Sequence, residues 1–250
     1  MCIRDRTWRP DEAYDEDEDD DKYWYWIEKD GKVYVPGQDE TGKDLVGWAY
    51  KYDLGDGALE IKNGGEQFSF AKKKVNSKDY FFNKNGEMIS NFIDVVEANV
   101  DEKGNAKIAE GMYYFGGSDD GSMKTGSQAI KDDAGDTYKF YFATKGTNKG
   151  AGITGNQNTK LYYYGMLIQA DDYKYQLATI GNHTFIVNTN GSIQHSKNTQ
   201  YKEDGDALIT TTNDTTFAPD GQFKYEIGGT YTVNPNLTGI NINEFVNVTD

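Results

Sequence analysis

A recurring pattern of aromatic residues, a short polar loop and a glycine sets the strongest limit on how this chain can fold. In the stretch YYFGGSDDGSMKTG, which begins at Tyr113, three adjacent rings precede a loop that ends at Gly121. Side chains on a β-strand alternate between its two faces, so Tyr113 and Phe115 share one face while Tyr114 lies on the other. Three rings in a row therefore predict a strand that is packed on both sides.

The same pattern recurs along the sequence. Its units begin WYWIEKDGKV, YFFNKNGEM, YYFGGSDDGSM, FYFATKG, YYYGML, FIVNTNGSI and TTFAPDGQF, and their turn glycines are Gly31, Gly86, Gly121, Gly146, Gly165, Gly191 and Gly221. A polar residue followed by glycine favours a hairpin turn, because that turn needs positive φ. Most units carry an apolar residue two positions after the glycine; the fourth has Asn148 there. A lone hairpin is marginal in water, so the pattern predicts an all-β fold, an elongated solenoid of stacked β-hairpin repeats.

Composition agrees with strands and tight turns. Only 36% of the 250 residues are hydrophobic, and the chain holds 28 Gly but 4 Pro. Much of the net charge of -15 comes from the run DEAYDEDEDDD at residues 11–21, where nine of eleven residues are acidic. We expect this run to be a disordered linker, with a calcium-collecting patch as the alternative. The excess negative charge argues against nucleic acid as a partner.

The first residues need separate treatment. MCIRDR resembles a translated sequencing adapter, although a genuine short basic N-terminus is the alternative. If Cys2 belongs to the adapter, no cysteine remains for a disulfide, a thiolate metal site or a nucleophile. The sequence contains no run of 18 apolar residues, so it predicts no transmembrane helix. The expected organisation is an adapter and acidic linker at 1–21, degenerate repeats at 22–65, well-formed hairpin repeats at 66–225, and terminal strands or a capping segment at 226–250.

The repeats resemble a known family. YYFGGSDDGSMKTG and YFFNKNGEMISNF are similar to the cell-wall-binding repeats of choline-binding, glucan-binding and clostridial toxin proteins, with a later segment similar to the variant in surface proteins of gut clostridia. The resemblance implies a hairpin solenoid that anchors a secreted protein to cell-wall polymers or related glycans. It further implies a cell-wall-associated or cell-surface protein of a Gram-positive bacterium, with an upstream domain in the same chain.

The resemblance also suggests where a ligand would bind. The choline-binding branch encloses a quaternary ammonium in three rings, one of them a Trp after Thr-Gly. That Trp is replaced by Phe92, Ser127 and Asn156 and kept only at Trp48, so choline is less expected than carbohydrate, which stacks on exposed rings. The candidate ligand-binding rings are Trp24, Trp26, Trp48, Phe81, Tyr114, Tyr141 and Tyr163. Alternatively, these rings pack between neighbouring repeats and do not contact a ligand.

Catalytic chemistry finds little support in the sequence. His183 and His195 have no second His or Cys beside them, so neither a metal site nor a cofactor is expected. The doublets Asp119-Asp120, Asp132-Asp133 and Asp171-Asp172 are interpreted as turn solvation, with calcium as a weak alternative. A thin array offers no deep cleft for glycosidase carboxyls. The sequence therefore predicts a non-catalytic cell-wall or glycan-binding module, with any catalytic domain lost upstream. The alternative is a structural spacer or adhesin stalk; a choline-binding module and a peptidoglycan-hydrolysing enzyme are less expected.

Overall fold

The computed structural model describes residues 7–10, 23–37, 45–52, 67–223, 231–237 and 239–240. These residues form antiparallel sheets joined by turns and loops, and none of them is helical. The prediction of an all-β fold is confirmed. The acidic run at 11–21 lies outside the described residues, as does most of 226–250.

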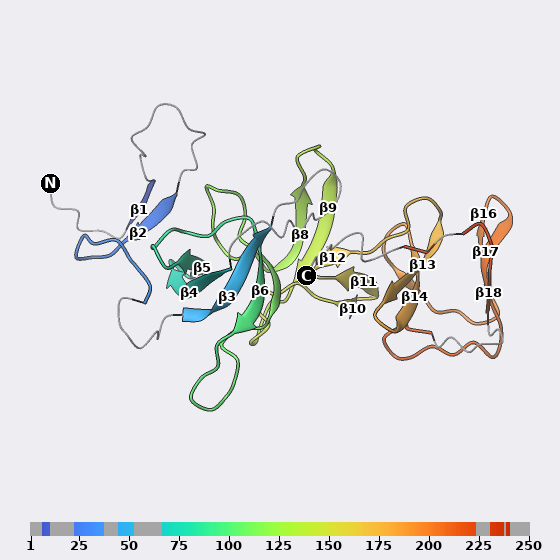
Figure 1. Ribbon diagram of the computed structural model, residues 1–250. Coiled ribbons are helices and arrows are strands. Elements are labelled where there is room, and N and C mark those ends of the chain that lie inside the picture. The colour runs from blue at the N-terminus through green and yellow to red at the C-terminus, as the bar shows by residue number, and fades with distance from the viewer. Residues whose placement is uncertain are drawn as a thin grey trace.

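The sheets follow one another along the molecule in nearly the order of the sequence (Figure 1). The first pairs β1 (Thr7–Pro10) with β2 (Trp24–Ile27). The second has the order β5-β4-β3-β6-β7, with β3 (Leu45–Tyr52), β4 (Phe68–Val75), β5 (Lys78–Asn83), β6 (Phe92–Ala98) and β7 (Gly111–Tyr114). The third has the order β10-β11-β12-β9-β8, with β8 (Gly126–Lys131), β9 (Thr137–Phe142), β10 (Gly155–Gln157), β11 (Lys160–Tyr163) and β12 (Met166–Leu167).

Two smaller sheets complete the chain. The fourth joins β13 (Tyr175–Ile180), β14 (His183–Asn188) and β15 (Ile193–Gln194). The fifth joins β16 (Gln200–Glu203), β17 (Asp206–Thr211) and β18 (Tyr231–Val233). Each of these sheets is built from residues close in sequence, which is the expected consequence of stacked hairpins.

Consecutive aromatic side chains on one strand pack in two different hydrophobic cores. On β5, Phe81 packs with Tyr113 and Phe115 in one cluster, while the neighbouring Tyr80 and Phe82 pack in another. Each of these five side chains is at most 7% exposed. The expectation that Tyr113 and Phe115 form a core pair is thus confirmed. Because alternate side chains enter opposite faces, a short strand can hold two thin cores together.

The predicted turn glycines all have positive φ, from +61° at Gly121 to +90° at Gly165 and Gly221. One assignment needs correction: in the fourth hairpin the structural equivalent is Gly150, not Gly146. The Gly150 N–H donates to the carbonyl of Ala143 at 2.8 Å, just as the N–H groups of four other turn glycines donate back to the carbonyl at the start of their turns, namely Gly31, Gly86, Gly191 and Gly221. That loop is longer than the others, so the sequence pattern placed its glycine too early.

Six of the turn glycines pack directly against the preceding hairpin, whereas the first, Gly31, has no atom within 4 Å of where a Cβ would stand. A Cβ atom on any of these six would lie between 2.1 and 3.1 Å from an atom of that hairpin, so even alanine would force that atom to shift. The contacting pairs are Gly86 with Tyr34, Gly121 with Met88, Gly150 with Met123, Gly165 with Gly152, Gly191 with Leu167 and Gly221 with Ile193. In most pairs the contacted residue is the one predicted from its spacing after the previous glycine. These contacts link the hairpins into a continuous series.

Candidate functional site

The candidate rings fall into two groups. Trp26 is 2% exposed and Phe81 is 0% exposed, so core packing occupies both side chains. Phe81 stacks on Phe70 with centroids 4.6 Å apart. Trp48 is 40% exposed and therefore offers the most open ring. The half-buried rings are Trp24, Tyr114, Tyr141 and Tyr163.

The half-buried tyrosines also serve packing. Tyr114 lies 4.5 Å from Phe92 between ring centroids, and Tyr163 meets Tyr164 edge-on at 4.8 Å. The candidate rings are distributed along the array, with Trp24 and Trp26 on the same strand, β2. Burial leaves Trp26 and Phe81 without an exposed face for a ligand.

One candidate, Trp24, does line a hollow. Its ring, the side chain of Met88 and the loop residues Asp119 and Asp120 enclose about 250 Å³. These residues come from three successive hairpins. The Trp24 indole Nε1 is buried, and it has no hydrogen-bond partner within the described part of the chain. An unmet buried N–H costs free energy.

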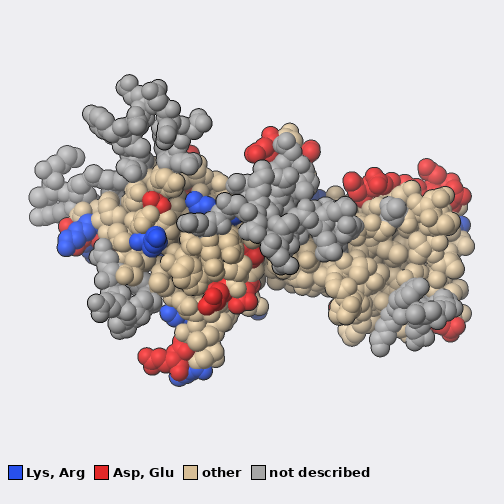
Figure 2. Space-filling view, in the orientation of Figure 1, with Lys and Arg blue, Asp and Glu red and all other residues tan. Residues whose placement is uncertain are grey.

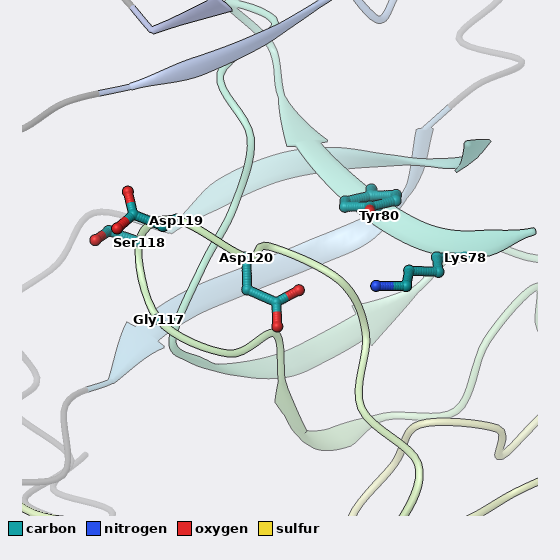
Figure 3. A pocket seen from close by; sticks show the side chains of 6 residues that line it. All are labelled: Lys78, Tyr80, Gly117, Ser118, Asp119 and Asp120. Atoms are coloured by element: carbon teal, nitrogen blue, oxygen red, sulfur yellow. The ribbon is translucent and has the colours of Figure 1, made fainter. Parts of the chain in front are cut away.

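A second, wider hollow lies beside the same loop. It encloses about 610 Å³ and is lined by Lys78, Tyr80 and residues 117–120. Figure 3 shows Lys78 and Tyr80 on one strand, with the Asp120 carboxylate and the Lys78 ammonium directed toward the space between them. The two hollows share Asp119 and Asp120. We call them together the Asp120 groove, made of Trp24, Lys78, Tyr80, Met88 and residues 117–120.

The loop that forms the groove is held in place by local bonds. Gly116 and Gly121 bracket it, both with positive φ, and the Asp120 N–H donates to the Gly117 carbonyl at 3.0 Å. The Asp120 carboxylate accepts hydrogen bonds from the Ser122 side chain and backbone and forms an ion pair with Lys124. These bonds fix the direction of the carboxylate toward the groove.

The charge of Asp120 is well supported. Burial by itself would raise its pKa, but hydrogen bonds from Lys124 and Ser122 outweigh burial and hold the pKa below the usual value. Burial raises the pKa of Tyr80, and the nearby charge of Asp120 raises it further. The groove therefore presents a stable carboxylate and a neutral phenol at neutral pH.

The sequence pattern missed most of this groove. It selected Trp24 but interpreted Asp119-Asp120 as turn solvation, and it did not select Lys78 or Tyr80. One usable signal was present: this is the unit whose loop, GGSDDG, carries two adjacent carboxylates between its rings and its turn glycine. Which hairpin those carboxylates would face depends on stacking, which the sequence does not specify.

A partly buried carboxylate lies elsewhere, at Asp94. The Tyr52 hydroxyl donates to it at 3.4 Å, and Tyr50 is its cross-strand neighbour. Burial raises the pKa of Asp94; the Tyr52 hydrogen bond opposes this shift and the charge of Glu110 adds to it. Asp94 lies beside a packed aromatic cluster, and we assign it a structural role.

The groups needed for metal or nucleophilic chemistry are not gathered at the groove. Among the described residues, no three or more His, Cys, Asp or Glu side chains lie close enough to hold a metal ion. His183 and His195 are both exposed, far along the chain from Asp120. The described segments also include no helix of the length and apolarity that crossing a membrane requires.

Comparisons with known proteins give a limited result. No protein-family model matches the chain, and its sequence matches no curated protein. Among solved structures, the chain is similar to CbpF in complex with ipratropium, with 17% identity and a TM-score of 0.35 over 83% of this chain and 58% of that chain. It is similar to choline-binding protein F of Streptococcus pneumoniae in the presence of a peptidoglycan analogue, with 17% identity and a TM-score of 0.36 over 82% of this chain and 62% of that one.

A third structure, CbpJ of Streptococcus pneumoniae, gives 16% identity and a TM-score of 0.37 over 84% of this chain and 67% of that chain. The present chain covers less than two thirds of the first two structures. Similarity of this degree carries no inference about function.

Proposed function

We propose that this chain is a non-catalytic module that binds cell-wall polymers or related glycans through the Asp120 groove. The observation that carries the proposal is the hollow of about 250 Å³ that Trp24 and Met88 line together with Asp119 and Asp120, so that an indole ring and two carboxylates border one space. The repeat pattern, which resembles cell-wall-binding repeats, supports the same class of function.

The groove has the chemistry that sugars require. A sugar ring has an apolar face that stacks on an aromatic side chain, and hydroxyls that donate to carboxylates and accept from N–H groups. The groove supplies the Trp24 ring, two carboxylates and the Lys78 ammonium. The Trp24 indole offers a larger face for such stacking than the phenyl ring of a phenylalanine would.

The wider setting follows from the same proposal. The chain would be the anchoring region of a longer secreted or surface protein of a Gram-positive bacterium, with another domain upstream. The alternative, a spacer without its own ligand, is favoured by the burial of Trp26 and Phe81, which shows that stacking uses some of the candidate rings.

Retention on insoluble polymers tests the proposal. The protein is mixed with purified Gram-positive cell walls or insoluble glucans, and the bound fraction is measured for wild type, Trp24→Phe and Asp119→Asn. Trp24→Phe keeps a ring but removes the N–H, and Asp119 is exposed, so both variants should fold. We expect each to weaken retention about tenfold, which corresponds to 1.4 kcal/mol.

Asp133→Asn is the matched control, because it removes the same charge from an exposed position in the β8–β9 turn. It should bind like wild type. Failure of wild type to bind any of the polymers would favour the spacer. Hydrolysis of peptidoglycan or glucan by this chain would contradict a non-catalytic role.

A further inference from the structure

Three consecutive lysines on β4 have unequal surroundings. Lys73 is paired: its Nζ lies 2.6 Å from Glu28 Oε1 and 3.8 Å from the centroid of the Tyr34 ring. Lys72 and Lys74 lie on the opposite face of the strand by alternation. The described part of the chain gives neither of them an ion pair within 4 Å.

The carboxylate that lies across from Lys74 is already engaged. Asp79 stands directly across from Lys74 in the β4–β5 register, and it is 8% exposed. Its Oδ2 is 2.7 Å from the Nζ of Lys149. Asp79 is thus paired with Lys149, lies across from Lys74, and its charge also acts on Lys72. We call Lys72, Lys74, Asp79 and Lys149 the Lys149 cluster.

The fourth hairpin loop places Lys149 there. This loop closes with a backbone bond from Ala143 to Ala151, whereas the second hairpin closes from Asn83 to Glu87, so it is longer by four positions. Bonds within the loop, such as Lys149 N–H to the Gly146 carbonyl at 3.1 Å, hold its shape. The longer loop of the fourth hairpin, which moves the turn glycine from its expected position, is thus also the segment that places Lys149 beside Asp79.

The cluster has an unbalanced local charge. Burial lowers the pKa of Lys72; Asp79 opposes this shift, while Lys149 and Lys74 add to it by repulsion. Close cations repel strongly where water is partly excluded, and an anion placed among them would relieve that repulsion. Figure 2 shows that basic side chains on the visible face gather over the N-terminal half, whereas acidic ones dominate the other end.

We propose that the Lys149 cluster binds the phosphate group of an anionic phosphodiester polymer. A phosphodiester brings a negative charge and several acceptor oxygens, so more than one ammonium group can reach it at once. The chain as a whole carries a net charge of -15, which repels polyanions, so a local excess of cations is what could hold one.

This proposal is independent of the Asp120 groove. Asp79 and Lys78 are neighbours on β5 and face opposite sides, so the cluster and the groove lie on different faces of that strand. The glycan proposal could fail while this one holds. Asp119→Asn should leave phosphate binding unchanged.

Calorimetric titration tests it, with poly(glycerol phosphate) as the polymer probe and inorganic phosphate as the small-anion probe. We expect saturable polymer binding that weakens about tenfold in Lys74→Gln and in Lys149→Gln. Each substitution should also lower the slope of log affinity against log salt by about one, as loss of a single phosphate contact does. Lys74 is exposed, so its variant tests binding with little effect on folding. Lys73→Gln is the matched control and should bind like wild type.

Several results would overturn the proposal. One is equal affinity of wild type, Lys74→Gln and Lys149→Gln for the polymer. Another is the absence of saturable binding to the polymer at low salt. Binding of inorganic phosphate with no affinity for the polymer would show a small-anion site and would contradict the polymer assignment.

Discussion

Gly191 lies directly against Leu167: a Cβ atom on the glycine would stand 2.5 Å from Leu167 Cδ1. Gly150 has the same relationship to Met123, whose Sδ would be 2.5 Å from the added atom. The glycine is thus needed twice, once for the positive φ of its turn and once for close approach of the next hairpin. This contact couples the local turn to the stacking of the array.

Gly191→Ala separates these two effects from each other when it is compared with Gly181→Ala. Both glycines have positive φ, but nothing lies within 4 Å of a Cβ on Gly181. We expect about 1–2 kcal/mol from backbone strain in each variant, and a further 1–3 kcal/mol from overpacking in Gly191→Ala alone. Urea unfolding gives both values. Equal losses would mean that the neighbouring hairpin moves away at no cost.

Replacing Tyr113 and Phe115 together by alanine tests whether the array unfolds locally. Both side chains are 0% exposed, and each large ring removed from a core costs about 3 kcal/mol. In a series of stacked units the damage should reach only adjacent hairpins. Hydrogen exchange should show lost protection near β5 to β9 and retained protection at β14 and β17. Uniform loss along the chain would instead show a single cooperative core.

The sequence could predict features that depend on spacing. The glycine turns and the apolar residues after them come from local geometry, and most were placed correctly. Gly150 was missed because a four-residue longer loop shifts the turn without changing the strand pattern. Aligning the repeats by a fixed spacing assumes that all their loops have the same length, and this loop does not.

The sequence could not predict which rings are open. Trp26 and Trp48 both belong to aromatic repeats, yet one is 2% and the other 40% exposed. The difference depends on which strands cover each face of a sheet. The contact between Asp79 and Lys149 likewise joins residues 70 positions apart. Such contacts arise from stacking, and no local pattern records them.

Asp94→Asn should stabilise the protein at neutral pH. Burial raises the pKa of Asp94, so the native state disfavours its charged form. On acidification the native state binds this proton before the unfolded chain does, so Asp94 favours folding at low pH and this contribution is lost as pH rises through the raised pKa. Asparagine removes the charge, and its advantage should shrink on acidification. Urea unfolding of both proteins at neutral and acidic pH measures this change.

Tyr52→Phe provides the companion measurement. The Tyr52 hydroxyl donates to Asp94 and so favours the charged carboxylate. Removing it should raise the pKa of Asp94 further and strengthen the fall of stability between acidic and neutral pH. If Asp94→Asn gave the same stability difference at both pH values, the carboxylate would have to be solvated in the folded protein.

Asp79→Asn should make stability depend on salt in a new way. Asp79 is the carboxylate among Lys72, Lys74 and Lys149, so the substitution leaves three cations to repel one another. Because Lys74 and Lys149 are partly in water, we expect a loss of about 1 kcal/mol rather than the 3–5 kcal/mol of a fully buried pair. The loss should shrink near 1 M salt, where the screening length is about 3 Å.

Adding Lys149→Gln removes one of the repelling cations, so the double variant should lose less than the sum of the single losses. Urea unfolding of the four proteins at low and high salt measures both effects, and salt-independent, additive losses would show that the lysines are too far apart to act on a common anion.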